Sequence, residues 1–427
     1  MTEVLWMYGA LLLTLLLGVP IPIAVAIAAV VGLYLIELPF VALSQALYTG
    51  LEPIPLMTIP LFVFAGALME KGGLASRIVA VAQSLVGRYT GSLGMVTIIG
   101  CTFFAALSGS GPATTAAIGA IMIPAMVHQG YDKAFGGALA ASGGALGSLI
   151  PPSNLMIIYA IVSDNSIPRL FLAGILPGLV ASLFLMGCTW IIAKKRGYGT
   201  AAEAFCWNRF TQAVWQGKWA LAAPLVILGG IYAGIFTPTE AAAVAVVYAF
   251  ITGRFVYGEL DNTKLRECMK ITALISGTVL MILGPAKAFG ELMSLMAVPD
   301  LIGDMLAEYT STPWLVLLLM IAVLILSGMF LESIAQIILF VPLMLPIATV
   351  AGIDPILFGV IMVIACEIGF LTPPVGANLF VADRITQVGI DRLSVAVLPL
   401  LVCYLLTIVA VIAFPSLATW LPNAVYG

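Results

Sequence analysis

The sequence predicts an all-α integral membrane protein built from two inverted repeats, each with about five spanning helices and one re-entrant hairpin. Three observations support this prediction: apolar runs of about 20 residues recur along the chain, motifs repeat in order, and positive charge is unevenly distributed. Hydrophobic residues make up 62% of the 427 residues, and charged residues only 9%. A soluble domain carries about 25% charged residues, so this chain has too little charge to cover a water-facing surface.

Two successive sets of apolar segments give the expected helices. The first set falls near residues 4–17, 22–36, 44–70, 92–107, 113–127, 133–163 and 168–193. The second set falls near residues 219–234, 238–255, 270–297, 312–327, 333–350, 355–382 and 394–420. The sequence lacks the short alternating strands of a membrane barrel. We therefore expect a first repeat over residues 1–193 and a second over residues 219–427.

A polar and basic segment at residues 194–218 separates the two repeats. It interleaves large apolar side chains, among them Trp207 and Trp215, with charged and polar residues. This pattern is typical of an amphipathic helix that lies in the membrane interface. The alternative is an ordinary solvated loop.

Motifs that recur in the same order indicate the duplication. "GVPIP" at residues 18–22 matches "GIFTP" at residues 234–238, and "AGALM" at residues 65–69 matches "FGELM" at residues 289–293. Six further residues recur at one fixed spacing: Pro124, Gly130, Asp132, Gly147, Pro151 and Pro152 match Pro346, Gly352, Asp354, Gly369, Pro373 and Pro374.

The distribution of Lys and Arg predicts how the repeats are oriented. An odd number of spans in each repeat inverts the second repeat. With both termini outside, all but two of the 17 Lys and Arg residues then fall in cytoplasmic segments. The exceptions are Arg169, on the outer side, and Lys287, within a span. This arrangement satisfies the positive-inside rule. Charge alone does not distinguish a hairpin from two full spans at residues 92–127, but modest length and a polar tip favour the hairpin.

Four polar breaks interrupt the apolar segments. Two lie at hairpin tips, "SGSGPATT" (108–115) and "SGMFLES" (327–333), and two lie within long spans, "GSLIPPSN" (147–154) and "GFLTPPVGAN" (369–378). Membranes tolerate unwound backbone only where it is buried in protein or lines a cavity. The prolines lack an amide donor, so the carbonyls one turn before them are left free. These carbonyls, together with small hydroxyls, suit a weakly held sodium ion. The helices that restart after each break present backbone amides at their N-termini, which suit an anion.

Inverted repeats whose broken helices meet near the membrane midplane are typical of secondary transporters. The alternative interpretation is that glycine and serine only allow close helix packing. That explains a single break more easily than two symmetric pairs.

Four stretches resemble the large membrane subunit of tripartite ATP-independent periplasmic (TRAP) transporters: "LSGSGPATTAAIGAIMIPAM", "GGALGSLIPPSNLMIIYAI", "GIFTPTEAAAVAVVYAF" and "GFLTPPVGANLFVA". The resemblance covers nearly the whole chain. It implies an elevator-type secondary transporter of the bacterial inner membrane that couples uptake of an organic acid, of the sialic acid or C4-dicarboxylate class, to sodium. It also implies two partners, a small four-helix membrane subunit and a periplasmic substrate-binding protein.

The resemblance also implies two sodium sites, each between a hairpin tip and the neighbouring span break, and hence at least two Na⁺ per cycle. The first site comprises Ser108 and Ser110 with carbonyls of Gly147, Ile150 and Pro152. The second comprises Ser327, Gly328, Gly369, Thr372 and Val375, at a bulkier and more acidic tip. The candidate substrate-binding residues are Thr114, Thr115, Asn154, Glu332 and Asn378. Neither an organic cofactor nor nucleic acid is expected.

Two other function classes compete with this interpretation. A stand-alone sodium–dicarboxylate carrier would share the inverted repeats and hairpins but need no partner. A membrane enzyme would need paired acids, a metal site or a nucleophile with a base. One loop histidine, His128, and six scattered cysteines favour none of these. Lys287 and Glu291 lie one helical turn apart and are expected to pair, and Glu240 is expected to cap a helix.

Overall fold

The computed structural model describes residues 2–86, 90–198, 206–298, 301 and 312–427, and their regular secondary structure is entirely helical. Within these residues, nine helical stretches are long and apolar enough to cross a membrane. The predicted all-α membrane class is therefore confirmed. Residues 199–205 of the predicted linker lie outside the described residues, as do residues 299–300 and 302–311 between the apolar segments expected near 270–297 and 312–327.

The helices follow the predicted apolar segments in both parts of the chain. The first part contains α1 (Thr2–Leu16), α2 (Ile21–Leu35), α3 (Val41–Thr49), the 3₁₀ helix η1 (Ile54–Met57), α4 (Thr58–Lys71), α5 (Leu74–Leu85), α6 (Ser92–Ser108), α7 (Gly111–His128), α8 (Lys133–Leu149), α9 (Asn154–Val162) and α10 (Ile167–Arg196). The second part contains α11 (Trp207–Tyr232), α12 (Pro238–Ile251), the π-helix η2 (Thr252–Val256), α13 (Asn262–Leu295), α15 (Pro313–Gly328), α16 (Ser333–Val350), α17 (Pro355–Phe370), α18 (Ala377–Thr386), α19 (Ile390–Ala413) and α20 (Ser416–Tyr426).

Three segments differ from the sequence-based expectation. The apolar run at 44–70 is divided into α3, η1 and α4. Residues 71–91, between the segments expected near 44–70 and 92–107, contain the helix α5. Residues 207–218 of the predicted linker do not form a separate helix, because they begin the continuous helix α11. The interfacial position of that segment stays a prediction.

The helices of the two expected hairpins are short. They contain 17 and 18 residues in α6 and α7, and 16 and 18 residues in α15 and α16. At 1.5 Å per residue they are about 24–27 Å long, less than the roughly 30 Å of a hydrocarbon core. By contrast, α10 has 30 residues and α13 has 34. Because α7 and α16 are still among the nine stretches that could cross a membrane, these lengths do not distinguish re-entrant hairpins from spans, and the hairpins stay a prediction together with the inverted repeat.

Polar side chains define where the central helices begin. Asp132 caps α8 by accepting a hydrogen bond from the Phe135 amide at 2.9 Å, and Asp354 caps α17 by accepting from the Ile356 amide at 2.8 Å. These two aspartates belong to the recurring motif set. Thr237 and Glu240 form a reciprocal capping box at the start of α12, as expected for Glu240.

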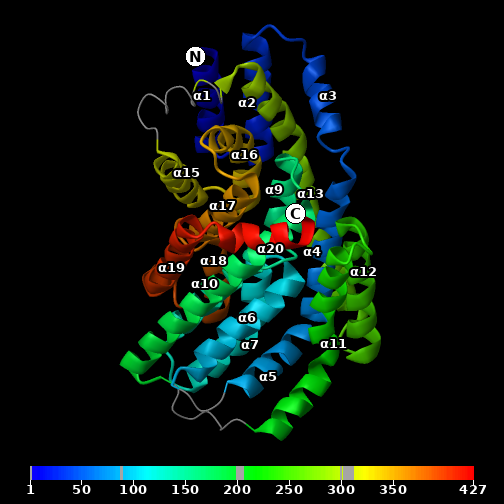
Figure 1. The fold of residues 1–427 in the computed structure, drawn as a ribbon, viewed down its shortest axis with the longest axis vertical. Coiled ribbons are helices and arrows are strands. Elements are labelled where there is room, and N and C mark those ends of the chain that lie inside the picture. Colours follow the sequence, from blue (N-terminus) through cyan, green and yellow to red (C-terminus); the bar gives the residue numbers. More distant parts are fainter. Residues whose placement is uncertain (1, 87–89, 199–205, 299–300, 302–311) are drawn as a thin grey trace.

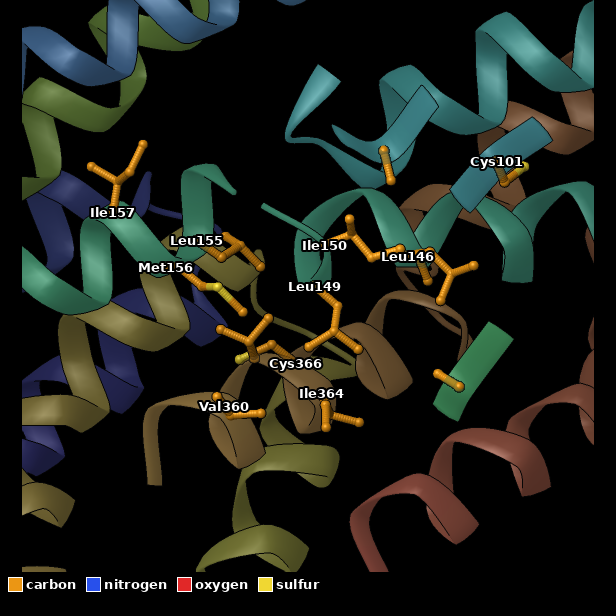
Figure 2. Close-up of a cluster of buried hydrophobic side chains, with 14 of the residues drawn as sticks. Cys101, Leu146, Leu149, Ile150, Leu155, Met156, Ile157, Val360, Ile364 and Cys366 are labelled. Atoms are coloured by element: carbon orange, nitrogen blue, oxygen red, sulfur yellow. The ribbon is translucent and has the colours of Figure 1, made fainter. Parts of the chain in front are cut away.

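The core lies around α8 and α17. All residues of α8 from Ala134 to Leu149 are buried, as are all residues of α17 from Ile356 to Phe370. In Figure 1, α6 and α7 lie in the lower half of the molecule and α15 and α16 in the upper half. Figure 2 shows Leu149, at the end of α8, close to Cys366 of α17. The first span break is therefore enclosed by helices from both parts of the chain.

Candidate functional site

The first hairpin tip is a short turn between α6 and α7. Helix α6 ends at Ser108 because Gly109 adopts a left-handed conformation, with φ of 62°, which glycine allows at little cost. Ser110 is extended, and α7 restarts at Gly111. The Ser108 and Thr114 hydroxyls lie 2.6 Å apart, so the two ends of the turn are joined by a buried hydrogen bond.

This tip packs directly against the first span break, between α8 and α9. The backbone amide of Asn154 donates a hydrogen bond to the Gly109 carbonyl at 3.1 Å. A Cβ at Gly147 would lie 2.5 Å from both the Ser110 carbonyl oxygen and the Thr114 hydroxyl, and a Cβ at Gly109 would lie 2.5 Å from the Pro152 carbonyl oxygen. The two segments therefore approach closely only because both positions are glycine.

Four of the five predicted ligands of the first sodium site are thus brought together: Ser108, Ser110, Gly147 and Pro152. The fifth, Ile150, directly follows α8; its side chain packs against Gly178 of α10, whereas the predicted ligand is its backbone carbonyl. The oxygen atoms that converge here are hydroxyls and backbone carbonyls, which are ligands that suit a hard monovalent cation. The residues present therefore fit a sodium site.

The second hairpin tip joins α15 and α16 and packs against the break between α17 and α18. The Val375 amide donates to the Met329 carbonyl at 3.0 Å. A Cβ at Gly369 would lie 2.6 Å from the Cα of Gly328, so the two backbones are in direct contact. Ser327 directly precedes Gly328, which is the last residue of α15. Four predicted ligands of the second site therefore lie at this junction, namely Ser327, Gly328, Gly369 and Val375.

A buried amide, Gln336, completes this second junction. Its Nε2 donates to the Ser327 hydroxyl at 2.9 Å and also to the Leu324 carbonyl. The Thr372 hydroxyl donates to the carbonyl of Ile368, in the last turn of α17, at 2.7 Å. The lone pairs of the Thr372 hydroxyl are left for another partner, so this residue still fits the predicted ligand set.

The five candidate substrate-binding residues lie in different surroundings. Thr114 and Thr115 are fully buried, and the Thr115 hydroxyl donates to the Gly111 carbonyl at 3.0 Å. Glu332 is exposed at the start of α16 and makes no side-chain capping bond. Asn154 is buried, with its Oδ1 lacking a hydrogen-bond partner among the described residues. The structure therefore groups Thr114 and Thr115 with the first tip and leaves Glu332 apart.

Asn378, the fifth candidate, points into the centre of the molecule. Its Nδ2 donates to Glu367 Oε2 at 3.2 Å, and both side chains are buried. A Cβ at Gly111 would lie 3.0 Å from the Asn378 amide nitrogen and 3.1 Å from Glu367 Oε2. The second span break therefore also contacts the first hairpin tip.

Three polar residues of this centre were not among the predicted ligands or substrate-binding residues: Ser148, Gln336 and Glu367. The Gly111 amide donates to the Ser148 hydroxyl at 3.2 Å, so Ser148 links α8 to the first tip. Ser148 lies inside the "GSLIPPSN" motif, and Gln336 is the sole amide side chain in an otherwise apolar stretch, so a sequence signal existed for both. Glu367 stands out as a charge before a break, but its contact with the first tip depends on the tertiary fold.

The expected pair of Lys287 and Glu291 is present on α13, with 3.6 Å between nitrogen and oxygen. Both residues line a cavity of about 570 Å³ between α3, α9, α13 and α16. This cavity lies beside α16, a helix of the second hairpin, and not at either hairpin tip.

Comparison with known proteins gives matches over nearly the full chain. Residues 8–417 match the family described as "Tripartite ATP-independent periplasmic transporter, DctM component". The chain is 38% identical over 431 residues to the C4-dicarboxylate TRAP transporter large permease protein DctM of Rhodobacter capsulatus, covering 97% of this chain and 98% of that protein. It is 37% identical to the sialic acid TRAP transporter large permease protein SiaM of Vibrio cholerae, covering 90% of each.

A third relative is longer than this chain. The isethionate TRAP transporter permease protein DctMQ of Oleidesulfovibrio alaskensis is 41% identical over 412 residues, and the match covers 96% of this chain and 65% of that protein. Two solved structures share the fold alone. The YdaH transporter of Alcanivorax borkumensis superposes with a TM-score of 0.54 at 16% identity, covering 84% of this chain and 86% of that one. MtrF of Neisseria gonorrhoeae gives 0.57 at 14% identity, covering 87% and 82%.

Proposed function

Because this chain belongs to the family of DctM components of tripartite ATP-independent periplasmic transporters, we propose that it couples uptake of a small organic acid to sodium. Its relatives are named as transporter permeases, so the chain is a transporter component and not an enzyme. The single observation that best supports sodium coupling is the pair of junctions between a hairpin tip and a span break. Each brings neutral oxygens from two separate helices to one place.

Neutral oxygens suit a coupling ion that must bind and then leave. A carboxylate cage would hold a cation more tightly, whereas hydroxyls and carbonyls make a weak site. At the first junction the Ser110 carbonyl oxygen and the Thr114 hydroxyl, which is hydrogen-bonded to the Ser108 hydroxyl, lie against Gly147 near the end of α8. Two such junctions support the proposal of at least two Na⁺ per transport cycle.

The substrate class is proposed from the relatives. Those compared above are named for isethionate, C4-dicarboxylates and sialic acid, all of which are organic acids. Helix N-termini attract anions, and α9, α16 and α18 each begin next to a tip or break. We therefore propose that Asn154, Glu332 and Asn378, together with Thr114 and Thr115, border the substrate.

The proposed assembly lies at the bacterial inner membrane and contains two further components. The family description names a tripartite transporter, which supports a small membrane subunit and a periplasmic substrate-binding protein. Both termini of this chain are proposed to be periplasmic, on the evidence of the distribution of Lys and Arg.

An elevator motion is proposed from the way the helices group. Helices α2, α4, α11, α12 and α13 pack on one another, while α8 packs against α6, α7, α18 and α19. Helix α9 packs on α8 and α16 packs on α9 and α17, so both belong to the second group, and the cavity beside Lys287 lies where α13 of the first group meets them. Sliding of the second group against the first would carry both junctions across the membrane together.

Initial-rate uptake in proteoliposomes tests this function. The chain is reconstituted with and without the small membrane subunit and binding protein, across a panel of organic acids and sodium concentrations. We expect uptake only with both partners present, and a sigmoidal dependence on sodium. Robust uptake by the chain alone would favour the stand-alone sodium–dicarboxylate carrier, and equal uptake without sodium would contradict sodium coupling.

A further inference from the structure

A second cavity, of about 590 Å³, lies where the ends of three helices meet. Its walls come from the start of α8, the end of α10 and the start of α19, and these helices pack on one another. The cavity is at the opposite end of α8 from the first junction, and none of the proposed sodium ligands or substrate-binding residues lines it.

One end of this cavity is charged. Arg196, the last residue of α10, and Arg392, in the first turn of α19, both line it and are exposed. Arg196 donates a hydrogen bond to the Tyr198 hydroxyl at 3.3 Å. None of the ion pairs found among the described residues involves either arginine. A guanidinium group has five N–H donors, so both side chains keep donors for a ligand.

The other end of the cavity is apolar. Val395 and Pro399 of α19 line it, about one and two helical turns beyond Arg392. A rise of 1.5 Å per residue places Pro399 about 10 Å along the helix axis from Arg392. Exposed apolar side chains continue along the same helix at Leu398 and Val402. The cavity therefore changes from charged to apolar along one direction, as an amphiphilic molecule does.

The side chains around the charged end favour a negatively charged group. The cavity is lined by two carboxylates, Asp132 and Asp391, and Asp132 already accepts a hydrogen bond from the Phe135 amide at 2.9 Å. Against these two acids stand the two arginines and three lysines that adjoin the cavity in sequence, Lys133, Lys194 and Lys195. The N-terminal dipoles of α8 and α19 add to the positive potential.

An aromatic side chain near the same helix ends indicates that the charged end lies at a membrane surface. Trp190 of α10 is 45% exposed, and the Lys194 ammonium lies 5.2 Å from the centre of its ring. Tryptophan is enriched where helices leave the hydrocarbon region, and lysine extends its charge from there into water. On the topology proposed above, this surface is cytoplasmic, where anionic lipids make the membrane surface negative.

We propose that this cavity binds an anionic phospholipid. Its phosphate pairs with Arg196 and Arg392, and one acyl chain lies along α19 over Val395 and Pro399. Guanidinium groups bind phosphate oxygens through paired hydrogen bonds, and basic pockets between membrane helices are suited to anionic headgroups. A free phosphate ion would contact the charged end alone, whereas a lipid also covers the exposed apolar side chains.

The lipid would join three helices at one end of the second helix group. It contacts α10 through Arg196 and α19 through Arg392, and the start of α8 lies between them in the cavity wall. A ligand that binds only the folded chain stabilises it, so the lipid should hold these helix ends together. This lipid site does not require sodium coupling or a particular substrate.

Photocrosslinking tests the site and its occupant together. The purified full chain is placed in phosphatidylcholine nanodiscs that contain a small fraction of phosphatidylglycerol with a diazirine in its acyl chain, and crosslinked peptides are identified by mass spectrometry. We expect crosslinks concentrated on the parts of α10 and α19 that line the cavity. Unlabelled phosphatidylglycerol should compete, and phosphatidylethanolamine and inorganic phosphate should not.

Three results would overturn the proposal. Crosslinks spread evenly over the exposed helices would indicate bulk lipid only. Equal competition by phosphatidylethanolamine would mean that the site does not select a negative headgroup. Displacement by inorganic phosphate would indicate a site for a free anion.

Arginine variants test the proposed headgroup contacts. Arg196→Gln and Arg392→Gln should each reduce crosslinking at the cavity about 5-fold, which corresponds to about 1 kcal/mol. Arg266→Gln is the matched control, because it removes the same charge from an exposed position of α13 outside the cavity and should leave this crosslinking unchanged. Arg392→Gln keeps the test decisive if Arg196→Gln does not fold, because the Tyr198 contact is then retained. Unchanged crosslinking in both arginine variants would contradict the lipid site.

Discussion

The two junctions between a hairpin tip and a span break share a backbone plan but differ in side chains and in exposure. At the first, the whole break from Ile150 to Asn154 is buried. At the second, Thr372 and Val375 are half-buried and Pro374 is exposed. In each, a backbone amide that follows the double proline donates to a carbonyl of the tip.

The side chains explain much of this difference. The first junction is filled with small hydroxyl residues and glycines, and the Ser108 and Thr114 hydroxyls satisfy each other at 2.6 Å. The second relies on a longer amide, Gln336, whose Oε1 has no hydrogen-bond partner among the described residues. A tightly packed site is preorganised for its ion, while an open one must rearrange more on binding. We therefore expect the first site to bind sodium with less structural change than the second.

The largest expected effect comes from filling the first junction. Gly147→Ala would place a Cβ 2.5 Å from the Ser110 carbonyl oxygen, and overpacking of this kind costs about 1–3 kcal/mol. We expect sodium-dependent uptake by the assembled transporter to be lost. Gly277→Ala, on α13, is the matched control, because no atom lies within 4 Å of its Cβ position. Uptake by Gly147→Ala at the wild-type rate would show that the tip and the break need not touch.

The next largest effect separates the two sites by their hydroxyls. Ser110→Ala and Thr372→Val each remove one neutral ligand and nearly keep the side-chain shape. Loss of one such partner costs about 1–3 kcal/mol, or roughly a 5- to 150-fold loss of apparent sodium affinity. The measurement is initial-rate uptake against sodium with matched expression. Higher sodium should rescue both variants partly, which a folding defect would not allow. Identical sodium curves for wild type and both variants would rule out this assignment.

The sequence was sufficient for most of the helices and for the position of the breaks. Residues 333–350 were predicted as one segment and form α16 with the same bounds, because an uninterrupted apolar run leaves few alternatives. The run at 44–70 was predicted as one helix, but it is interrupted near Gly50, whose Cβ would lie 3.0 Å from the Cβ of Lys287. At this interruption the chain packs against α13, and no local sequence pattern indicates that contact.

The site was predictable only where a motif contained it. Ser108 and Gly147 lie in recognisable breaks of the first junction, and Gly369 lies in one of the second. The approach of each hairpin tip to its span break therefore followed from the resemblance. Gln336 and Glu367 lie within apolar helices, and their partners come from other parts of the chain. Helix α5 was missed because it is short and carries Arg77, which pairs with Glu259 before α13. Long-range partners of this kind require the tertiary structure.

A smaller effect is expected from the amide that distinguishes the second junction. Gln336→Met keeps the side-chain length but removes the donor to Ser327, so about 1 kcal/mol of stability should be lost. The measurement is the midpoint of thermal unfolding followed by tryptophan fluorescence. Gln216→Met, at an exposed position of α11, is the control and should leave the midpoint unchanged. An unaltered midpoint in Gln336→Met would mean that the amide does not support the second tip.

The last prediction perturbs neither junction and tests to which side of the membrane each is oriented. If the repeats are inverted, the first hairpin enters from the cytoplasm, the second enters from outside, and the residues before α11 are cytoplasmic. Cys206 reports on this, since it is the exposed cysteine of the chain, whereas Cys188 is half-buried and the other four are buried. The backbone amides of Arg209 and Asn208 hold the pKa of the Cys206 thiol below its usual range.

A lowered pKa leaves more thiolate at a given pH, and the thiolate is the form that reacts with maleimides. Labelling of Cys206 should therefore persist to lower pH than labelling of an ordinary exposed thiol. A membrane-impermeant maleimide should modify the wild type in inside-out vesicles but not in right-side-out vesicles, and Cys206→Ser should remove the signal. Labelling in right-side-out vesicles would reverse the predicted topology. The two junctions would then open to the sides opposite to those proposed, although their contacts would be unchanged.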